Sequence, residues 1–554
     1  MNKKVCSFPI LFALLAFVIG TCAVVFPASA QAAPTSTGSI TVSGTVARSY
    51  DAYQIFSANV VDGDNDAKIA TDLAWASDAV RDAALPLLHS AGMPNSQTTA
   101  QEAAEWLNAD SHLTSALSAQ LARSLQSSDA ESVALNAGRA AELPCGYWLI
   151  VADDAAISQD EAGTAPIMAL VGGSAITVKP KAATPKVSKH VLEDSTAAWQ
   201  KAADATVADD LYWRLSATVP AGLTAYDTYT VRFVDTMSAG LDPFKVAASM
   251  RVYVAAGADG GFGAVSAGKD GRAGTEPAKG WTDITAQCRV SVDGKTFTVR
   301  TGDLIADLGG TDTFTAGARV VAVYNAPLNS ACNHGIAKGN PNEVYLRYPR
   351  SPLADQSGDA GFTRTPSDDA CVYTWDLALT KRGSDGDKPL AGAVLSIADD
   401  RGRTLAADGT WDAEGKATVT SGEDGRVTVS GVDSGKLEVR ELKAPKGYTA
   451  FEGARSVTVK AEGLDVDQVA AAKPKLTITA ESPLRADSAD GSTGSLEASI
   501  INTPTGTPPS ITTGGFMPLT GDMAMYAVAA AAVAGAALIV VALLIRRGGG
   551  SHKE

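Results

Sequence analysis

Hydrophobic and polar residues alternate along much of the chain between residues 182 and 504, which is the pattern of half-buried β-strands. Successive side chains of a strand point to opposite faces, so each alternating run defines one apolar face. One such face is formed by Leu211, Trp213, Leu215, Ala217 and Val219. We therefore expect two successive β-sandwiches, over residues 182–372 and 373–504.

The pattern before residue 182 is mixed. Strand-like alternation near Ile40 gives way to Ala- and Leu-rich stretches with helical spacing at residues 98–108 and 111–127. A strand pattern returns at residues 146–151. We expect an α+β domain over residues 31–181, ahead of the two sandwiches, and a mostly β protein overall.

Two long apolar stretches lie at the ends of the chain. The first follows two lysines and ends in small residues, which indicates a secretory signal peptide over residues 1–30. The second, residues 523–545, carries no charge and is long enough to cross a bilayer as a helix. Arg546 and Arg547 follow it, and they would hold the C-terminal end of this helix in the cytoplasm.

Three predicted strands of the last sandwich each place one polar residue on the apolar face: Lys381, Glu441 and Asn502. Burial disfavours charge, so it favours a neutral, nucleophilic Lys amine and raises the pKa of the Glu carboxyl. The acid can then polarise the Asn carbonyl while the amine attacks it, which releases ammonia and leaves an amide bond. The competing interpretation is a buried ion pair between Lys381 and Glu441, with Asn502 in a turn.

The middle sandwich carries a similar set of polar residues. Lys189 shares an apolar face with its neighbours, Asp235 extends a second face, and Asn342 begins a third. A carboxylate on an apolar face is costly unless it is protonated or paired. We therefore expect Asp235 to be protonated or paired.

Charge and motif content narrow the functional classes. The chain has 46 basic and 61 acidic residues and a formal net charge of −15, and an acidic surface repels a phosphate backbone. Nucleic acid is therefore not an expected partner. The motifs GxSxG, HExxH and the P-loop are absent from the sequence, so we expect no enzyme with turnover, no cofactor and no metal.

Four cysteines remain after removal of the signal peptide: Cys145, Cys288, Cys332 and Cys371. An even number in an oxidising compartment permits two disulfides with three connectivities. We favour Cys332 with Cys371, because both lie close to one predicted domain boundary. The cysteine spacing fits no zinc site.

A short motif, Met517-Pro518-Leu519-Thr520-Gly521, precedes the C-terminal apolar run and the basic tail. This order of parts resembles the cell-wall sorting signal (LPxTG-like) of Gram-positive surface proteins, with Met517 at the position where that family usually has Leu. The resemblance implies that a sortase cuts between Thr520 and Gly521. Thr520 would then be joined to an amine of peptidoglycan or of another subunit. A plain C-terminal membrane anchor is the alternative.

The junction after the first domain resembles the pilin motif of sortase-assembled pilus backbone subunits, the major pilins. In that motif a Lys after Pro accepts the Thr of the next subunit, and Lys181 follows Pro180 here. The resemblance implies that Lys181 is the intersubunit acceptor. Lys179 is the fallback.

The segment 233–241 resembles the D2-type (Cna-A-like) domain of pilus backbones. That family joins a Lys on the first strand to an Asn on the last, with an Asp as catalyst. The resemblance implies a Lys189–Asn342 isopeptide bond with Asp235 as catalyst. If Arg350 occupies the Asn position instead, this bond is absent.

The segment 441–448 resembles the "E box" of Cna-B-type pilin domains. This resemblance implies a Lys381–Asn502 isopeptide bond in which Glu441 is the catalyst. The reaction would occur once, as self-modification.

Together these features predict a secreted structural subunit of a cell-surface pilus (fimbria), with tandem immunoglobulin-like or Cna-type sandwiches. The implied partners are a sortase, identical and accessory pilins, peptidoglycan and a host surface ligand that the pilus would bind in adhesion. A wall-anchored adhesin that never polymerises is the first alternative, and a surface hydrolase is the second. Residues 505–554 would form a linker, the sorting signal, the membrane helix and the tail.

Overall fold

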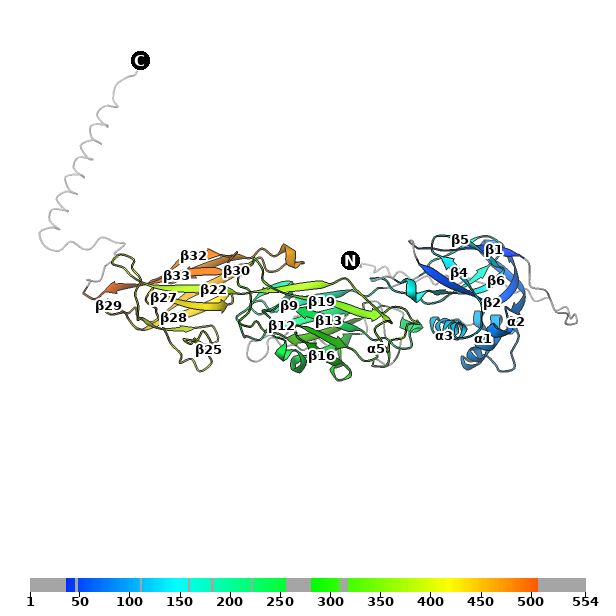
Figure 1. Ribbon diagram of the computed structural model, residues 1–554, viewed down its shortest axis with the longest axis horizontal. Helices are drawn as coiled ribbons and strands as arrows, with labels where there is room; N and C mark the ends of the chain where they lie inside the picture. Colours follow the sequence, from blue (N-terminus) through cyan, green and yellow to red (C-terminus); the bar gives the residue numbers. More distant parts are fainter. Residues whose placement is uncertain are drawn as a thin grey trace, which may run out of the picture.

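The computed structural model shows an elongated molecule with three folded parts in a row (Figure 1). It describes residues 36–44, 48–109, 112–157, 160–180, 184–220, 223–255, 280–307, 310 and 317–506. The predicted signal peptide, Lys181, the sorting motif and residues 523–545 lie outside the described residues. None of the helices within those described ranges is both long and apolar enough to cross a membrane.

The first part, which we call the N-terminal module, combines helices and strands, as expected. A three-stranded sheet has the order β5-β1-β8, and a five-stranded sheet has the order β3-β2-β6-β7 with β4 paired to β2. The strands are β1 (Thr37–Val42), β2 (Ser49–Asp62), β3 (Lys68–Trp75), β4 (Ser132–Asn136), β5 (Ala140–Pro144), β6 (Gly146–Ala152), β7 (Ile167–Val171) and β8 (Ile176–Val178). The helices are α1 (Asp78–Ser90), α2 (Ala100–Asn108) and α3 (Ser115–Gln126).

Local capping sets where these helices begin. Helix α3 starts four residues later than predicted, because the Thr114 side chain accepts a hydrogen bond from the backbone N–H of Leu117 and caps it. Helix α1 was not predicted. Its N-cap is Ser77, which accepts from Val80 N, and it contains Pro86.

The middle module is a sandwich of two sheets around one hydrophobic core that draws residues from both. The sheet orders are β10-β9-β12-β18-β14-β15 and β11-β21-β19-β13-β17-β16, with β20 paired to β19. The elements are β9 (Val187–Glu193), β10 (Ala198–Gln200), β11 (Ala202–Asp204), β12 (Tyr212–Thr218), β13 (Arg232–Met237), α4 (Val246–Ser249), β14 (Arg251–Ala255), β15 (Thr282–Asp283), β16 (Arg289–Asp293), β17 (Thr296–Arg300), α5 (Leu304–Asp307), β18 (Arg319–Asn325), β19 (Asn340–Pro349), β20 (Phe362–Arg364) and β21 (Asp368–Tyr373).

The C-terminal module is a second sandwich with its own core. The sheet orders are β27-β22-β33-β29, with β32 paired to β33, and β25-β24-β23-β28-β30-β31, with β26 paired to β23. The strands are β22 (Trp375–Gly383), β23 (Val394–Ala398), β24 (Thr404–Leu405), β25 (Trp411–Asp412), β26 (Val419–Thr420), β27 (Arg426–Val432), β28 (Gly435–Lys443), β29 (Tyr448–Thr449), β30 (Ala454–Glu462), β31 (Lys475–Ala480), β32 (Leu484–Asp490) and β33 (Ser495–Pro504). The prediction of a mostly β protein is confirmed.

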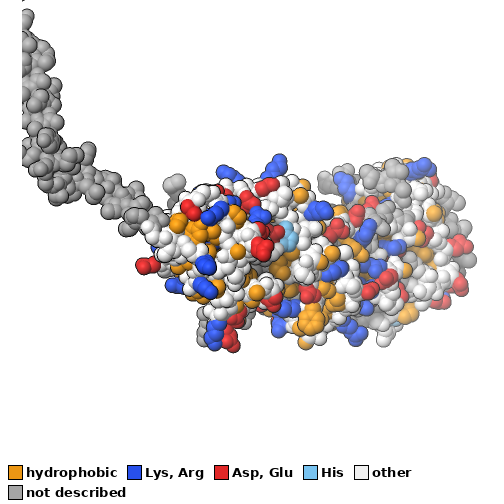
Figure 2. Space-filling view, turned by 60° about the vertical axis from the view of Figure 1, so that its left-hand side comes forward, with side chains coloured by type: hydrophobic (Ala, Val, Ile, Leu, Met, Phe, Trp, Pro, Cys, Tyr) orange, Lys and Arg blue, Asp and Glu red, His pale blue; other side chains and the backbone are white. Residues whose placement is uncertain are grey.

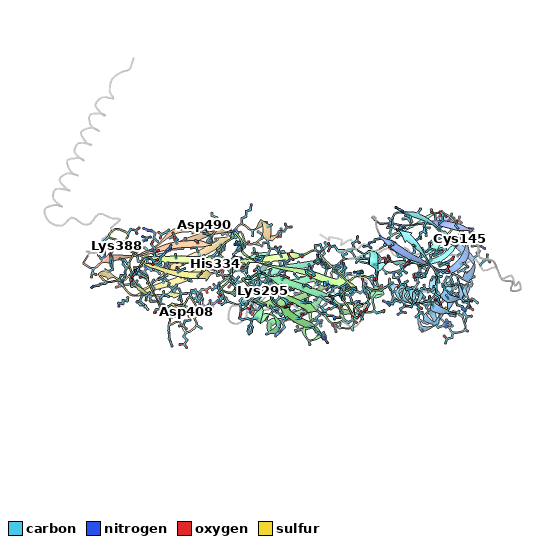
Figure 3. The ribbon with its side chains drawn as sticks, viewed as in Figure 1. Cys145, Lys295, His334, Lys388, Asp408 and Asp490 are labelled. Atoms are coloured by element: carbon cyan, nitrogen blue, oxygen red, sulfur yellow. The ribbon has the colours of Figure 1, made fainter. Side chains whose placement is uncertain are left out.

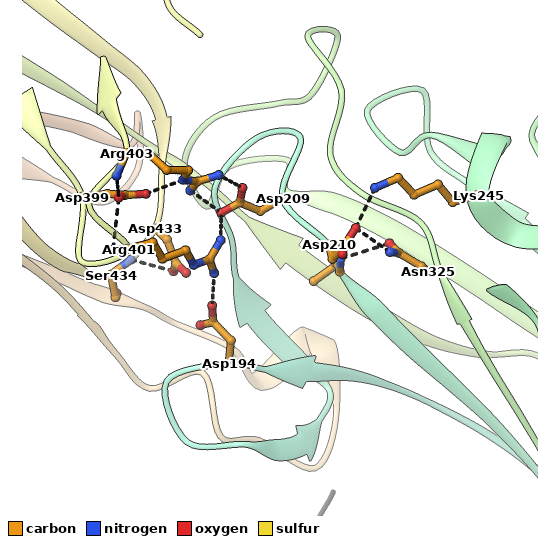
Figure 4. Close-up of polar contacts among 11 residues, drawn as sticks. Asp194, Asp209, Asp210, Lys245, Asn325, Asp399, Arg401, Arg403, Asp433 and Ser434 are labelled. Atoms are coloured by element: carbon orange, nitrogen blue, oxygen red, sulfur yellow. Dashed lines mark hydrogen bonds and ion pairs between the residues drawn. The ribbon is translucent and has the colours of Figure 1, made fainter. Parts of the chain in front are cut away.

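The middle and C-terminal modules are joined through a short, tightly bonded junction. Only Thr374 separates β21 from β22. Asp209 of the middle module binds both Arg401 and Arg403 of the C-terminal module, and Arg401 also reaches Asp194 at 3.2 Å (Figure 4). The junction thus restricts how the two sandwiches can turn against each other.

Acidic and basic side chains are interspersed over the face of the molecule seen in Figure 2.

The capping box of α2 generates a prediction for the N-terminal module. Thr99 Oγ1 accepts a hydrogen bond from Glu102 N at 3.2 Å, and the Glu102 carboxylate accepts from Thr99 N at 3.0 Å. Substitution Thr99→Ala should cost about 1 kcal/mol of helix stability, because one backbone N–H loses its partner. Hydrogen exchange of the α2 amides in the intact chain should therefore accelerate about fivefold. Thr98→Ala, at an exposed neighbour whose side chain caps nothing, is the control, and equal exchange in both variants would contradict the prediction.

Candidate cross-link sites

The C-terminal module brings Lys381, Glu441 and Asn502 together in its core. Strands β22 and β33 are parallel neighbours, with Lys381 opposite Ile500 and Gly383 opposite Asn502. Lys381 and Asn502 are therefore diagonal neighbours on one face. Glu441 comes from β28 in the other sheet of the sandwich. The alternation in the sequence predicted this placement of all three side chains on apolar faces.

The Glu441 carboxylate lies between the two nitrogens that a cross-linking reaction would involve. Lys381 Nζ is 3.4 Å from Glu441 Oε1, and Asn502 Nδ2 donates to Oε1 at 2.9 Å and to Oε2 at 3.0 Å. Phe451 N donates to Oε2 at 3.1 Å and holds the carboxylate in place. Lys381 Nζ also donates to the Ile500 carbonyl at 3.3 Å.

This site is buried, and burial makes the Lys381 amine easier to deprotonate. The side chains of Lys381 and Glu441 are 0% exposed. Burial lowers the pKa of Lys381 from 10.5 to about 8, although Glu441 opposes this shift. Asn502 Oδ1 is buried and accepts no hydrogen bond from the residues that the structure describes. The carbonyl is thus left open to polarisation by a proton donor.

The middle module assembles Lys189, Asp235 and Asn342 across its two sheets. Lys189 lies on β9 of one sheet, whereas Asp235 and Asn342 lie on the adjacent strands β13 and β19 of the other. Asp235 is opposite Val344 and Asn342 is opposite Met237, so the two polar side chains share a face. Lys189 Nζ forms an ion pair with Asp235, and all three residues are 0% exposed.

A fourth residue, Tyr324 on β18, links these three side chains. Its hydroxyl accepts from Lys189 Nζ at 2.9 Å and from Asn342 Nδ2 at 2.8 Å, and it donates to Asp235 Oδ2 at 3.0 Å. The ring packs edge-on against Phe297 with centroids 4.7 Å apart. Sequence reasoning missed Tyr324, because an aromatic residue on an apolar strand gives no signal beyond that of a core residue.

Burial shifts both members of the Lys189–Asp235 pair toward their neutral forms. It lowers the pKa of Lys189 to about 8 and raises the pKa of the Asp235 carboxyl, although each partner opposes the shift of the other. Burial, and then Asp235, hold the pKa of Tyr324 well above its ordinary value. Asp235 Oδ1 and Asn342 Oδ1 are buried and have no hydrogen-bond partner among the described residues.

The middle module departs from the expected strand order in one respect. Asn342 does not lie on the last strand, because β20 and β21 follow β19. The alternative position, Arg350, lies just beyond β19, and its guanidinium donates to the Asp154 carbonyl of the N-terminal module at 3.0 Å. Arg350 therefore contacts the neighbouring module, and Asn342 is the residue that meets Lys189 through Tyr324.

The expected disulfide between Cys332 and Cys371 is wrong for this structure. All four cysteines of the described residues are free thiols. Cys332 Sγ lies 3.6 Å from His334 Nε2, whereas Cys371 Sγ lies 3.8 Å from the Val372 carbonyl, so the two thiols have other partners. Figure 3 places Cys145 in the N-terminal module, remote from His334.

The predicted intersubunit acceptor, Lys181, lies outside the described residues, whereas residues 160–180 before it are described. Strand β8 ends at Val178, and Lys179, the fallback, is exposed. The predicted acceptor therefore follows two residues after the exposed Lys179, beyond the half-buried end of β8 at Val178.

Comparison with known proteins assigns the C-terminal module. Residues 376–473 match the family model SpaA, a prealbumin-like fold domain, and this stretch includes Lys381 and Glu441 but not Asn502. Over these residues the C-terminal module is thus similar to a SpaA prealbumin-like domain.

The trypsin-resistant surface T6 protein of Streptococcus pyogenes serotype M6 is 31% identical over 134 residues. This alignment covers 23% of this chain and 23% of that relative, so the chain matches about a quarter of the relative's length.

Two solved structures are similar at lower identity. The T6 backbone pilin of Streptococcus pyogenes has 16% identity and a TM-score of 0.46, over 85% of this chain and 99% of that one. The major pilin SpaD of Corynebacterium diphtheriae has 14% identity and a TM-score of 0.41, over 86% of this chain and 100% of that one. Both TM-scores are below 0.5, so these likenesses do not establish a shared overall fold.

The lowered pKa of Lys381 predicts a pH-dependent stability in a chain that cannot cross-link. In Asn502→Ala, Lys381 keeps its amine, which releases its proton near pH 8 when folded and near pH 10.5 when unfolded. Between these values the unfolded chain binds more protons, so stability rises with pH, by at most about 1.4 kcal/mol per pH unit. The contribution is complete above pH 10.5 and is lost as the pH falls through 8.

Denaturant unfolding of the C-terminal module at pH 8, 9 and 10 measures this slope. The double variant Asn502→Ala/Lys381→Met is the control, because it lacks the amine but keeps all other titrating groups. The same slope in both variants would show that the Lys381 pKa is not lowered by folding.

Proposed function

We propose that this protein is the structural subunit of a covalent cell-surface pilus, stabilised by internal Lys–Asn bonds. The observation that carries the proposal is the buried set of Lys381, Glu441 and Asn502, in which one carboxylate contacts both reacting nitrogens. The match to the SpaA domain model and the similarity to a streptococcal surface protein support it.

The chemistry in the C-terminal module follows from these contacts. Glu441 takes a proton from the Lys381 ammonium and, as an acid, polarises the Asn502 carbonyl. The neutral amine attacks the Asn502 side-chain carbon, one proton passes from the attacking to the departing nitrogen, and ammonia leaves. The fold supplies proximity in place of a high reactant concentration. The product is an amide between two neighbouring strands, formed once.

A bond at this place has a mechanical consequence. Lys381 lies on β22, the first strand of the module, and Asn502 lies on β33, the last. Tension that enters through one terminal strand crosses the amide to the other and bypasses the hydrogen-bond ladder. The bond also closes a loop of roughly 120 residues, which stabilises the folded state by about 5 kcal/mol in the chain-entropy model.

Subunits are joined from Thr520 of one chain to Lys181 of the next by a sortase, in this proposal. The last subunit is joined to peptidoglycan, and accessory pilins and a host surface ligand are further partners. The exposed Lys179, two residues before Lys181, supports this role, since the acceptor amine has to enter the active site of another protein.

Intact mass tests the internal bonds. The secreted wild-type chain should be lighter than its sequence by one ammonia per bond, and Glu441→Ala should regain one ammonia because its catalyst is lost. Glu438→Ala, at an exposed Glu on the same strand, should show the same loss of ammonia relative to its own sequence mass as the wild-type chain. A wild-type chain that has lost no ammonia would refute the proposal.

Polymerisation is tested on the cell surface. Wall extracts boiled in detergent should give a ladder of covalent multimers, and Lys181→Ala should collapse it to one band because the acceptor amine is missing. Lys179→Ala is the matched control and should leave the ladder intact. A single band from the wild-type strain would instead indicate a wall-anchored adhesin that does not polymerise, and a ladder in Lys181→Ala would exclude Lys181 as the acceptor.

A further inference from the structure

The two candidate sites differ in which group touches the reacting nitrogens. In the C-terminal module the Glu441 carboxylate contacts both Lys381 Nζ and Asn502 Nδ2. In the middle module Asp235 pairs with Lys189 Nζ, but the described contacts include no hydrogen bond between Asp235 and Asn342. Aspartate is one methylene shorter than glutamate. A second group therefore has to reach the Asn342 nitrogen.

Amide formation requires two separate proton movements. The Lys ammonium first loses one proton to become a nucleophile. The attacking nitrogen then loses a second proton, while the departing amide nitrogen gains one to leave as ammonia. A catalyst of the second movement has to contact both nitrogens at once, because the site holds 0%-exposed side chains and bulk water cannot act as the carrier.

We propose that Tyr324 is a catalytic residue that shuttles this second proton from Lys189 to Asn342. Its hydroxyl oxygen lies 2.9 Å from Lys189 Nζ and 2.8 Å from Asn342 Nδ2, so it contacts the attacking and the departing nitrogen at the same time. The inference rests on the proposed function, since it concerns the bond between Lys189 and Asn342.

The steps balance as follows. Asp235 takes the first proton from the Lys189 ammonium. The resulting acid polarises the Asn342 carbonyl, whose oxygen is buried and has no hydrogen-bond partner among the described residues. The amine attacks the Asn342 side-chain carbon. Tyr324 accepts one proton from the attacking nitrogen and gives its own hydroxyl proton to the departing nitrogen, so the phenol is regenerated. Ammonia leaves and takes up the proton held by Asp235, which returns to its carboxylate form.

The other contacts of the site agree with these separate roles for Asp235 and Tyr324. The Tyr324 hydroxyl donates a hydrogen bond to Asp235 Oδ2 at 3.0 Å, and this bond orients the hydroxyl. Asp235 Oδ1 has no hydrogen-bond partner among the described residues. Asp235 and Asn342 are diagonal neighbours on one sheet face. A single proton shared between Asp235 Oδ1 and Asn342 Oδ1 would therefore give both oxygens a hydrogen-bond partner. Glu441 does in one residue what Asp235 and Tyr324 do together.

The experiment follows bond formation in the full mature chain during cell-free synthesis. Peptide mapping over time separates the Lys189–Asn342 product from the Lys381–Asn502 product, and the second serves as an internal control. Tyr324→Phe should slow the Lys189–Asn342 bond about 100-fold or more, since general acid–base groups contribute at least that much, and should leave the Lys381–Asn502 bond at the wild-type rate.

Two further variants separate chemistry from folding. Tyr229→Phe also removes a buried hydroxyl from the same core, but this hydroxyl has no partner among the described residues, so the wild-type rate is expected. Adding Asp235→Glu to Tyr324→Phe should restore the bond, because a longer carboxyl can reach both nitrogens as Glu441 does. A purely structural defect would not be rescued in this way.

The outcomes distinguish the two proposals. If the wild-type chain forms no Lys189–Asn342 bond, the middle-module cross-link itself is refuted. If the wild-type chain forms it and Tyr324→Phe forms it equally fast, only the proton shuttle is overturned. Slow formation in Tyr324→Phe without rescue by Asp235→Glu would also overturn the shuttle.

Discussion

The structure depends on two lysine amines that are buried where water cannot solvate them. Lys189 and Lys381 lie in the cores of successive sandwiches, and burial lowers the pKa of each to about 8. An ion pair in such a place recovers only part of the desolvation cost. In the proposed reaction, amide formation would remove the charge altogether and so would relieve a cost that folding itself imposes. The apolar core would then both surround the reacting groups and contribute to the driving force.

The two sandwiches solve the placement of these amines in different ways. In the C-terminal module the Lys and the Asn are on adjacent parallel strands, and the acid faces them from the other sheet. In the middle module the Asn and the acid are adjacent, and the Lys faces them. Either arrangement presents three side chains at one point between two sheets. The proposed chemistry would therefore need two opposed sheets but no particular strand order.

Features that depend on the local residue pattern could be predicted from the sequence. Side-chain directions that depend on how distant strands pair could not. Period-2 alternation is local, so it placed Lys381, Glu441 and Asn502 on apolar faces. Tyr324 could not be predicted, because its contacts depend on how distant strands pair. Strands β18 and β9 flank β12 in one sheet, and β13 and β19 lie in the sheet that faces it. The pairing of Cys332 with Cys371 was inferred from closeness along the chain, which does not determine where two thiols point.

Contacts across the junction between the two sandwiches complement the bonds proposed inside each sandwich. Asp209 is held by two arginines of the C-terminal module, and Asp204 accepts hydrogen bonds from Trp375 Nε1 at 2.6 Å and from Ser434 N at 3.0 Å. The bond from Trp375 is buried and the bond from Ser434 is partly buried, and Trp375 is the first residue of the strand that carries Lys381. In the proposed pilus, a load on the middle module would therefore pass through this anchored strand to the position of the proposed amide. Covalent closure of each sandwich would protect such a fibre only if the non-covalent links between sandwiches are short and firmly held, and the contacts of this junction are suited to that role.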